Sequence, residues 1–490
     1  MKPLQHYQNV QNEMKTWVDE SMRPRYHFTA PAGFINDPNG FTVYNGKYQL
    51  FYQARYENCV GWGHAESADL VHFTHLPLAI FPGEEYDKDG CWSGGAIEKE
   101  GKLYLLYTGQ NNATDLKPQR EAQCLAYSTD GGVTFTKVKE NPVIPPELLT
   151  GDASHADFRD PSVWKRGENY YAVVGNSKNS AWKGQAQLFT SSDLITWKYV
   201  GVMYENPNLG AMWECPSFCP VDENTDLLVM SPIEVPVSGH DYHNSRSTVY
   251  LIGKLNYETG KFTPRKIGEI DHGKDFYAAQ VTRGIDGTPT LIAWMANWER
   301  EYKTERPFVG FANNFTLPRR LEIKKDELLQ FPAQGVENAF RRTKVKTFTV
   351  NGETKADADF FGSVQRLKIK ADMQNATAFT LKVFAGGETE TTLSYDKITG
   401  VFTVDNSKSD YPTKGEDRER VREGIRTVPV ALNGNTLALD VFLDVNTVEV
   451  FTQDGKVAMS TMSFNRPEKT QVLFSAEGEV KLQVEKYEFQ

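Results

Sequence analysis

Acidic residues in short polar clusters are the residues of this sequence that could do chemistry. The clusters are Asn36-Asp37-Pro38-Asn39-Gly40, Arg159-Asp160-Pro161, Trp213-Glu214-Cys215-Pro216 and Asp275-Phe276-Tyr277. Two carboxyl groups that flank a glycosidic bond can cleave it, because the ionised one attacks the anomeric carbon while the protonated one assists the leaving oxygen. Since like charges held close together resist double ionisation, we expect the pKa of one carboxyl group to rise and supply that acid.

The residues around these acids are typical of a sugar-binding site. Trp, Tyr, Asn, Gln and Ser accompany them, and a fifth cluster, Trp92-Ser93-Gly94-Gly95, has the same character without an acid. Aromatic faces pack on the C–H side of a sugar ring, and polar groups hold its hydroxyls. These residues also have purely structural interpretations. An isolated Asp-Pro more often forms a turn, and tryptophans often lie in the hydrophobic core. The tryptophans open to that second interpretation are Trp62, Trp92, Trp294 and Trp298.

Each of the five clusters precedes a recurring hairpin, which indicates how the clusters are positioned. The hairpin turns at Gly46, Gly101, Gly167, Asn224 and Gly287, at intervals of about 60 residues. A second motif recurs in step with it, beginning at Ser67, Ser128 and Ser191. About 60 residues hold a four-stranded antiparallel sheet with its loops, so five units predict an all-β, five-bladed β-propeller. A long meander or a sandwich is the alternative.

A propeller would bring the clusters together. The innermost strand of each blade faces the central channel, and loops at the channel mouth commonly carry function on such a scaffold. Residues at equivalent starts of the inner strands then meet at one mouth. We therefore expect the four acids to share one pocket. They are Asp37, Asp160, Glu214 and Asp275.

The ends of the chain read differently from the middle. Apolar residues between Leu4 and Val18 recur at three- and four-residue steps, which predicts an amphipathic helix of about four or five turns. After the last propeller segment, short alternating strands with Gly and Asn turns predict a C-terminal β-sandwich. The predicted domains are a helical extension, a catalytic propeller, a linker and a sandwich, over residues 1–25, 26–333, 334–343 and 344–490.

Composition excludes several classes of function. The chain has 490 residues and a net charge of −10, so it lacks the basic surface of proteins that bind nucleic acid or anionic membranes. It has no signal-like or membrane-spanning apolar run, and five scattered cysteines read as free thiols in a reducing cytoplasm. No metal site is expected, because His240 and His243 lie in a loop without evident further ligands. No cofactor motif occurs, so we expect none.

The motifs taken together resemble glycoside hydrolase family 32, the β-fructosidases. The resemblance runs from about Tyr26 to the end and includes HFTAPAGFINDPNG, WSGGA, FRDPSVW, WECPSF and TVEVFTQDG. It implies a five-bladed propeller followed by a β-sandwich. It also implies that Asp37 is the nucleophile, Glu214 the general acid and base, and Asp160 a transition-state stabiliser. Residues implied to line the substrate pocket are Asn36, Gln53, Trp62, Trp92, Ser93, Arg159, Asp275, Tyr277 and Trp294.

The activity that this resemblance implies is retaining hydrolysis of terminal β-D-fructofuranosides in sucrose and short fructo-oligosaccharides. Retention predicts that the carboxyl groups of Asp37 and Glu214 lie about 5–5.5 Å apart. A sucrose-6-phosphate hydrolase and a non-catalytic carbohydrate-binding propeller are the alternatives. The first would need phosphate donors, for which the candidates are Arg55, His64, Arg300, Lys303 and Arg306. A small sugar is the expected partner, and sheet edges could support a homodimer.

Overall fold

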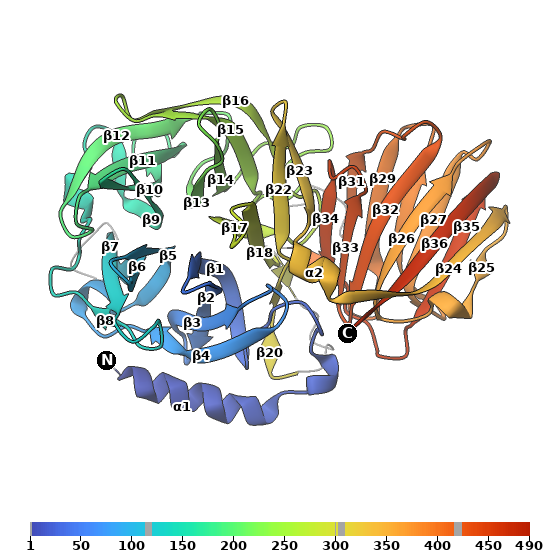
Figure 1. Ribbon diagram of the computed structural model, residues 1–490, viewed down its shortest axis with the longest axis horizontal. Coiled ribbons are helices and arrows are strands. Elements are labelled where there is room, and N and C mark those ends of the chain that lie inside the picture. The colour runs from blue at the N-terminus through green and yellow to red at the C-terminus, as the bar shows by residue number, and fades with distance from the viewer. Residues whose placement is uncertain (1, 113–119, 299, 302–308, 416–423) are drawn as a thin grey trace.

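The computed structural model describes residues 2–112, 120–298, 300–301, 309–415 and 424–490. Figure 1 shows two bodies side by side, a ring of small sheets and a pair of larger sheets joined to it. None of the helices in those ranges is both long and apolar enough to cross a bilayer. The predicted all-β architecture, a propeller followed by a sandwich, is confirmed.

The ring consists of five sheets, each built in chain order from a central strand outward. The first holds β1 (Gly33–Tyr44), β2 (Lys47–Tyr56), β3 (Cys59–Ser67) and β4 (Phe73–Ile80), and the second β5 (Gly90–Lys99), β6 (Lys102–Asn111), β7 (Arg120–Ser128) and β8 (Thr136–Lys137). The third holds β9 (Ala153–Arg166), β10 (Asn169–Lys178), β11 (Gly184–Ser191) and β12 (Trp197–Glu205), and the fourth β13 (Trp213–Pro220), β14 (Asp226–Pro232), β15 (Val249–Asn256) and β16 (Lys261–Glu269). The fifth holds β17 (Tyr277–Arg283), β18 (Pro289–Met295), β21 (Asn314–Phe315), β22 (Arg319–Lys324) and β23 (Glu327–Pro332), while the short β20 (Phe311–Ala312) adds to the first.

The inner strands close into a ring. Each of β1, β5, β9, β13 and β17 packs against its two neighbours in this order, and β17 returns to β1. The predicted hairpins are the two inner strands of each sheet, and the turn glycines Gly46, Gly101, Gly167 and Gly287 have positive φ. The serine motif also has a structural cause, because Ser67, Ser128 and Ser191 each donate to an aspartate two residues later.

Every inner strand is irregular where its chemical cluster stands. The register with the neighbouring strand shifts between Ile35 and Pro38, Trp92 and Gly94, Arg159 and Ser162, Glu214 and Ser217, and Tyr277 and Gln280. Such bulges re-aim side chains, and proline is tolerated there because no ladder hydrogen bond is lost. The Asp-Pro and Cys-Pro pairs are therefore bulges of the inner strands, which turn their acids toward the channel.

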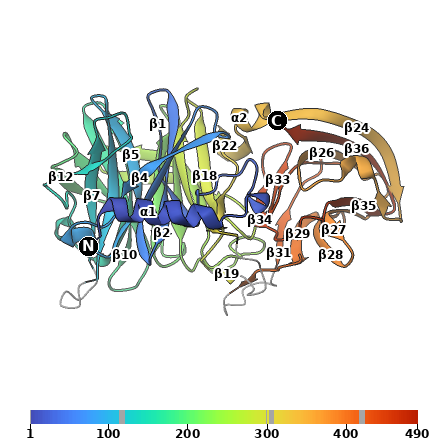
Figure 2. The ribbon, with the colours of Figure 1, turned by 90° about the horizontal axis from the view of Figure 1, so that it is seen from below.

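The N-terminal helix is shorter than predicted. α1 (Leu4–Met14) lies along the outside of the propeller beside β4 (Figure 2), and the chain continues as a 3₁₀ turn over Lys15–Trp17. Tyr7 stacks on Phe81 at 4.5 Å, whereas the Trp17 side chain is 51% exposed. The helix covers the propeller through Tyr7 and Gln11, whereas the Trp17 side chain at the end of the apolar pattern stays largely in solvent.

The C-terminal body is a sandwich of two six-stranded sheets. One holds β24 (Phe340–Asn351), β26 (Val364–Asp372), β32 (Thr436–Asp444), β33 (Thr447–Thr452), β34 (Ala458–Met462) and β36 (Glu479–Phe489). The other holds β25 (Lys355–Ala356), β27 (Ala378–Gly386), β28 (Thr389–Asp396), β29 (Val401–Lys408), β31 (Ile425–Pro429) and β35 (Gln471–Glu477). A short pair, β19 (Arg300–Glu301) and β30 (Lys414–Gly415), joins the two bodies, as does α2 (Gln334–Asn338). The predicted domain boundaries stay predictions.

A buried ionic cluster fastens the sandwich to the propeller. Arg319 of β22 lies 2.7 Å from Asp271 and 2.8 Å from Glu449, a residue of β33. His27 lies 2.9 Å from Asp444 and 3.0 Å from Glu449. All five side chains are inaccessible to solvent or nearly so, and they belong to three separate parts of the chain. We call these five residues the interface cluster.

Candidate active site

The bulges of the inner strands surround one cavity of about 220 Å³ at a mouth of the channel. Four of the five blades contribute side chains from their inner strands. The residues that line the cavity are Asn36, Asp37, Gln53, Arg55, Trp92, Arg159, Asp160, Glu214, Arg246 and Trp298. Three carboxylates from three blades, far apart in sequence, therefore meet in one place.

Asp37 is held by hydrogen bonds from the first two blades. Ser93 Oγ donates to its Oδ2 at 2.6 Å, and Asn36 Nδ2 donates to its Oδ1 at 3.1 Å. These hydrogen bonds hold the side chain of Asp37 in place, and the residue is only 7% exposed. Burial raises the pKa of Asp37 more than the hydrogen bond from Ser93 lowers it, and the charge of Glu214 adds to the rise. Asp37 thus presents a carboxylate that water barely stabilises.

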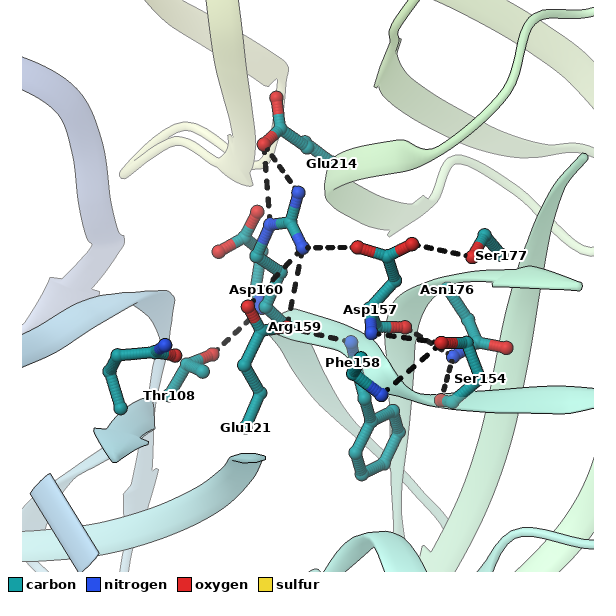
Figure 3. Close-up of polar contacts among 12 residues, drawn as sticks. Thr108, Glu121, Ser154, Asp157, Phe158, Arg159, Asp160, Asn176, Ser177 and Glu214 are labelled. Atoms are coloured by element: carbon teal, nitrogen blue, oxygen red, sulfur yellow. Dashed lines mark hydrogen bonds and ion pairs between the residues drawn. The ribbon is translucent and has the colours of Figure 1, made fainter. Parts of the chain in front are cut away.

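Asp160 lies at the bulge of β9, with φ at +63°, in the left-handed region that non-glycine residues seldom adopt. Its backbone N–H donates to Thr108 Oγ1 at 2.8 Å (Figure 3). Its Oδ2 accepts from the backbone N–H of Cys215 at 3.0 Å. Burial raises the pKa of Asp160 to about 8 despite Arg159, and the charges of Asp37 and Glu214 add to the rise. The Cys215 thiol lies 3.5 Å from both Asp37 and Asp160, which shows how close the two acids come.

Glu214 has the opposite environment. Arg159 Nη2 donates to its Oε1 at 2.8 Å, Arg246 Nη1 donates to its Oε2 at 3.2 Å, and the Tyr277 hydroxyl donates to Oε2. Burial alone would raise the pKa of Glu214, but the two arginines and the Tyr277 hydrogen bond together lower it. The acids whose pKa values rise are therefore Asp37 and Asp160. The sequence predicts that repulsion between carboxylates by itself decides which one is protonated. That prediction is incomplete, because Arg159 and Arg246 lower the pKa of Glu214.

Arg159 is itself positioned by acids that the sequence reasoning missed. Figure 3 shows its guanidinium between Glu214 on one side and Glu121 and Asp157 on the other. Its Nη1 lies 3.3 Å from a carboxylate oxygen of each of the latter two residues. Glu121 is a buried acid in strand β7, whose sequence REAQCLAYS mixes polar and apolar residues, so no local signal singles it out.

The predicted pocket residues separate into a lining and a support. Asn36, Gln53, Trp92 and Arg159 line the cavity with the three acids. Ser93 and Tyr277 act through hydrogen bonds to Asp37 and Glu214. Two tryptophans are fully buried behind the lining: Trp62 donates to the backbone carbonyl of Trp92 at 2.9 Å, and the ring of Trp294 lies 4.9 Å from that of Trp298.

Asp275, which the resemblance placed in the substrate pocket, is not among the residues that line the cavity. Its carboxylate accepts the backbone N–H of Met462 at 2.8 Å, and its own N–H donates to Ser460, so it faces the sandwich rather than the cavity. It precedes the inner strand β17, whereas the three acids of the cavity lie within theirs. The short distance between Asp275 and Tyr277 in sequence concealed this difference.

The phosphate-donor candidates also separate. Arg55 lines the cavity and lies over the rings of Phe34 and Trp298, at 5.8 and 5.3 Å from their centroids. His64 is buried and stacks on Phe51, away from the cavity. Lys303 and Arg306 lie outside the described residues, as does the side chain of Arg300. Arg246 was not a candidate, yet it lines the cavity from the loop between β14 and β15.

Comparison with known proteins shows the family of the chain. Residues 27–332 match the N-terminal domain of glycosyl hydrolases family 32, and residues 335–489 match the C-terminal domain of that family. A sucrose-6-phosphate hydrolase of Zymomonas mobilis is 32% identical over 95% of this chain and 91% of its own. A raffinose invertase of Escherichia coli is 31% identical over 93% of this chain and 92% of its own.

Two solved structures have the same fold. The GH32 beta-fructofuranosidase of Bombyx mori superposes with a TM-score of 0.82 at 31% identity, covering 99% of this chain and 97% of its own. The sucrose-6-phosphate hydrolase of Lactobacillus gasseri gives a TM-score of 0.85 at 27% identity, covering 98% of this chain and 96% of its own. The similarity spans both bodies of the molecule.

Proposed function

Since the chain belongs to glycosyl hydrolase family 32, we propose that it is a retaining β-fructofuranosidase that releases fructose from the non-reducing end of sucrose and short fructo-oligosaccharides. The observation that carries the proposal is the meeting of Asp37, Asp160 and Glu214 from three blades around one cavity. Trp92 and Trp298 offer aromatic faces to a sugar ring, and Asn36 and Gln53 offer amides to its hydroxyls.

The first step forms a covalent intermediate on Asp37. Its carboxylate attacks C2 of the fructosyl unit, the bond from C2 to the glycosidic oxygen breaks, and Glu214 gives its proton to that oxygen. The glucosyl part leaves as an alcohol. In the second step Glu214 takes a proton from water, the resulting oxygen attacks C2, and Asp37 leaves. The configuration at C2 is inverted twice and therefore retained.

Asp160 supports this chemistry without forming a bond to carbon. Its raised pKa keeps the carboxyl group protonated at neutral pH in the ligand-free site, so that Asp37 can ionise beside it. A neutral carboxyl group can both donate to and accept from the hydroxyls of fructose. We propose this as its role in holding the ring through the transition state.

Glu214 must gain a proton before it can act as an acid. In the ligand-free site Arg159 and Arg246 favour its ionised form. A leaving group that draws Arg246 away would raise the pKa of Glu214 and let it hold a proton. Binding of the leaving group would in this way control the acid.

Two arginines of the cavity favour a second candidate substrate. Arg55 and Arg246 both line the cavity, and a guanidinium binds a phosphate through two parallel hydrogen bonds. A phosphate on the glucosyl group of sucrose would compete with Glu214 for Arg246, as the preceding step requires. This observation favours sucrose 6-phosphate, the substrate in the printed name of the Zymomonas mobilis relative.

The deciding experiment compares kcat/KM on sucrose and sucrose 6-phosphate for the wild type and for Arg55→Gln and Arg246→Gln. If the phosphorylated sugar is the substrate, each variant loses about tenfold or more on it, as expected for a charge-assisted hydrogen bond, and much less on sucrose. Equal losses on both sugars assign the arginines to Glu214 or to the fold and leave sucrose as the substrate. Release of fructose from neither sugar would contradict the proposal.

The proposal includes a cytoplasmic location. The five cysteines are all free and four of them are buried, as expected of thiols kept reduced. A homodimer stays a prediction, and light scattering after gel filtration distinguishes it from a monomer. Nucleic acid and membranes are not expected as partners of a chain with a net charge of −10.

A further inference from the structure

A second group of ligand-type side chains lies away from the cavity, next to the sandwich. Asp241 stands in the loop between β14 and β15, Glu269 ends β16, and His272 follows three residues later. One possible ligand atom from each of the three lies within 4.8 Å of the other two. We call these three residues the loop cluster. The mechanism proposed above does not use them.

The distances in the loop cluster do not match hydrogen bonds. His272 Nδ1 lies 3.5 Å from Asp241 Oδ1 and 3.6 Å from Glu269 Oε2, beyond the 2.7–3.2 Å of an ordinary N–H···O bond. The nitrogen is buried and has no hydrogen-bond partner among the described residues. If His272 were protonated and bridged the two acids, its Nδ1–H would therefore make only long, weak hydrogen bonds.

The same distances match the edges of a metal coordination polyhedron. Zinc binds histidine nitrogen at about 2.0–2.1 Å and carboxylate oxygen at about 2.0–2.2 Å, so neighbouring ligands of a tetrahedral site lie about 3.3–3.5 Å apart. His272 Nδ1 is placed at nearly this spacing from both acids. The ligand set of one histidine and two carboxylates also suits a divalent ion of this kind.

The charge and burial of the two carboxylates also favour a metal site. The Glu269 side chain is 4% exposed, and no lysine or arginine of the described residues pairs with it. Its Oε2 also accepts the backbone N–H of Tyr242 at 2.7 Å, which fixes its orientation as an outer-shell contact does in metal sites. The Asp241 side chain is 48% exposed, so an ion can enter from solvent.

We propose that Asp241, Glu269 and His272 bind one divalent cation of the zinc class, with water completing the coordination. This proposal differs from the expectation from the sequence that the chain has no metal site. The loop that carries Asp241 also carries Arg246, five residues on, which hydrogen-bonds Glu214. The ion therefore ties that loop to the β16–β17 connection and limits the movement of Arg246.

Binding is tested directly on the full chain after dialysis against a chelator. Titration with Zn²⁺, followed by mass-spectrometric metal analysis, should give one tightly held equivalent per chain, and Co²⁺ should give the visible absorption of a tetrahedral site. His272→Ala and Asp241→Asn should each weaken binding by more than about tenfold, since even outer-shell changes have effects of that size. Asp241 is half exposed on a loop, so its variant keeps the experiment informative if His272→Ala does not fold.

The matched control is His72→Ala, which removes an exposed histidine that pairs with Asp69 at 2.8 Å. It should bind Zn²⁺ as the wild type does. Trypsin cleavage after Arg246 should be slower with Zn²⁺ than without it in the wild type, and unchanged by Zn²⁺ in the Asp241→Asn variant. Binding that is absent, or that is equal in the wild type and both loop-cluster variants, would overturn the proposal. None of these readouts depends on the sugar that the enzyme hydrolyses.

Discussion

The molecule holds two buried groups of three carboxylates, and their surroundings differ. The catalytic cluster, Asp37, Asp160 and Glu214, borders a cavity. The carboxylates of the interface cluster are buried between the propeller and the sandwich. They are Asp271, Asp444 and Glu449. Both groups are shielded from water, so burial raises the energy of the ionised acids in each. The two groups differ in the cations that accompany their acids.

In the interface cluster the cations fit between the acids. Arg319 contacts Asp271 and Glu449, and His27 contacts Asp444 and Glu449. Burial would lower the pKa of His27, but the two acids outweigh it and raise that pKa to about 9. Burial would raise the pKa of Glu449, but His27 and Arg319 lower it instead.

In the catalytic cluster the cations lie to one side. Arg159 and Arg246 contact Glu214, whereas Asp37 and Asp160 receive hydrogen bonds from neutral groups. The pKa values of these two acids rise as a result. A compensated group of charges holds two bodies together, and an uncompensated one is poised to react at a cost in stability.

The largest expected effect is on turnover at the uncompensated cluster. Asp37→Asn removes the nucleophile while keeping the shape of the side chain, so kcat for sucrose should fall by about 10⁴-fold or more. The melting temperature should not fall, because the substitution removes a buried charge. Activity assays and thermal unfolding on the same preparation test both statements. Turnover like that of the wild type would exclude Asp37 as the nucleophile.

The second effect concerns the interface cluster, where we expect a loss of stability without a loss of turnover. Arg319→Met leaves Asp271 and Glu449 without their shared cation, which should lower the free energy of unfolding by about 3–5 kcal/mol. The folded fraction should keep its kcat. Denaturant unfolding and active-site titration measure the two quantities separately. A stability loss under about 1 kcal/mol would contradict the compensating role of Arg319.

The third effect depends on the leaving group. Glu214→Gln removes the proton donor, so kcat/KM on sucrose should fall by about 10²–10⁴-fold. A fructoside whose leaving group needs no proton should lose much less in the first step. Rates of leaving-group release in single turnover measure that step alone. Equal losses on both substrates argue against Glu214 as the acid.

The smallest effect is a pH dependence of stability. The pKa of Asp160 is about 8 in the folded chain and about 3.8 when unfolded, so the folded state holds a proton that the unfolded state releases. Stability from this residue is lost as the pH rises from about 4 to 8. Asp160→Asn should thus unfold like the wild type near pH 4 and be more stable than the wild type at pH 8. Parallel stability curves across this range would contradict the raised pKa.

The sequence predicted the frame of the site because its signals are local and repeated. Turn glycines and the serine motifs recur with the blades, and the Asp-Pro pairs mark bulges on inner strands. Apolar spacing alone did not show where the first helix ends, because that depends on what α1 packs against.

Residues that act from a loop, from another blade or toward the sandwich could not be predicted in this way. Arg246 reaches Glu214 from a loop of irregular sequence, and Glu121 supports Arg159 from another blade. Asp275 stands near the start of an inner strand yet turns to the sandwich, because the backbone of Met462 offers it a hydrogen bond. These contacts depend on how loops and sheets pack in three dimensions, which no single segment encodes.

The most direct test of the account is to identify the residue that becomes bonded to fructose. In the Glu214→Gln variant, a fructoside with a good leaving group should load the enzyme, and the missing base should slow its hydrolysis. Peptide mass spectrometry after rapid acid quench should then find one fructosyl residue on Asp37, and none when Asp37→Asn is added. A fructosyl residue on Asp160, or turnover without any covalent adduct, would contradict the proposed division of roles.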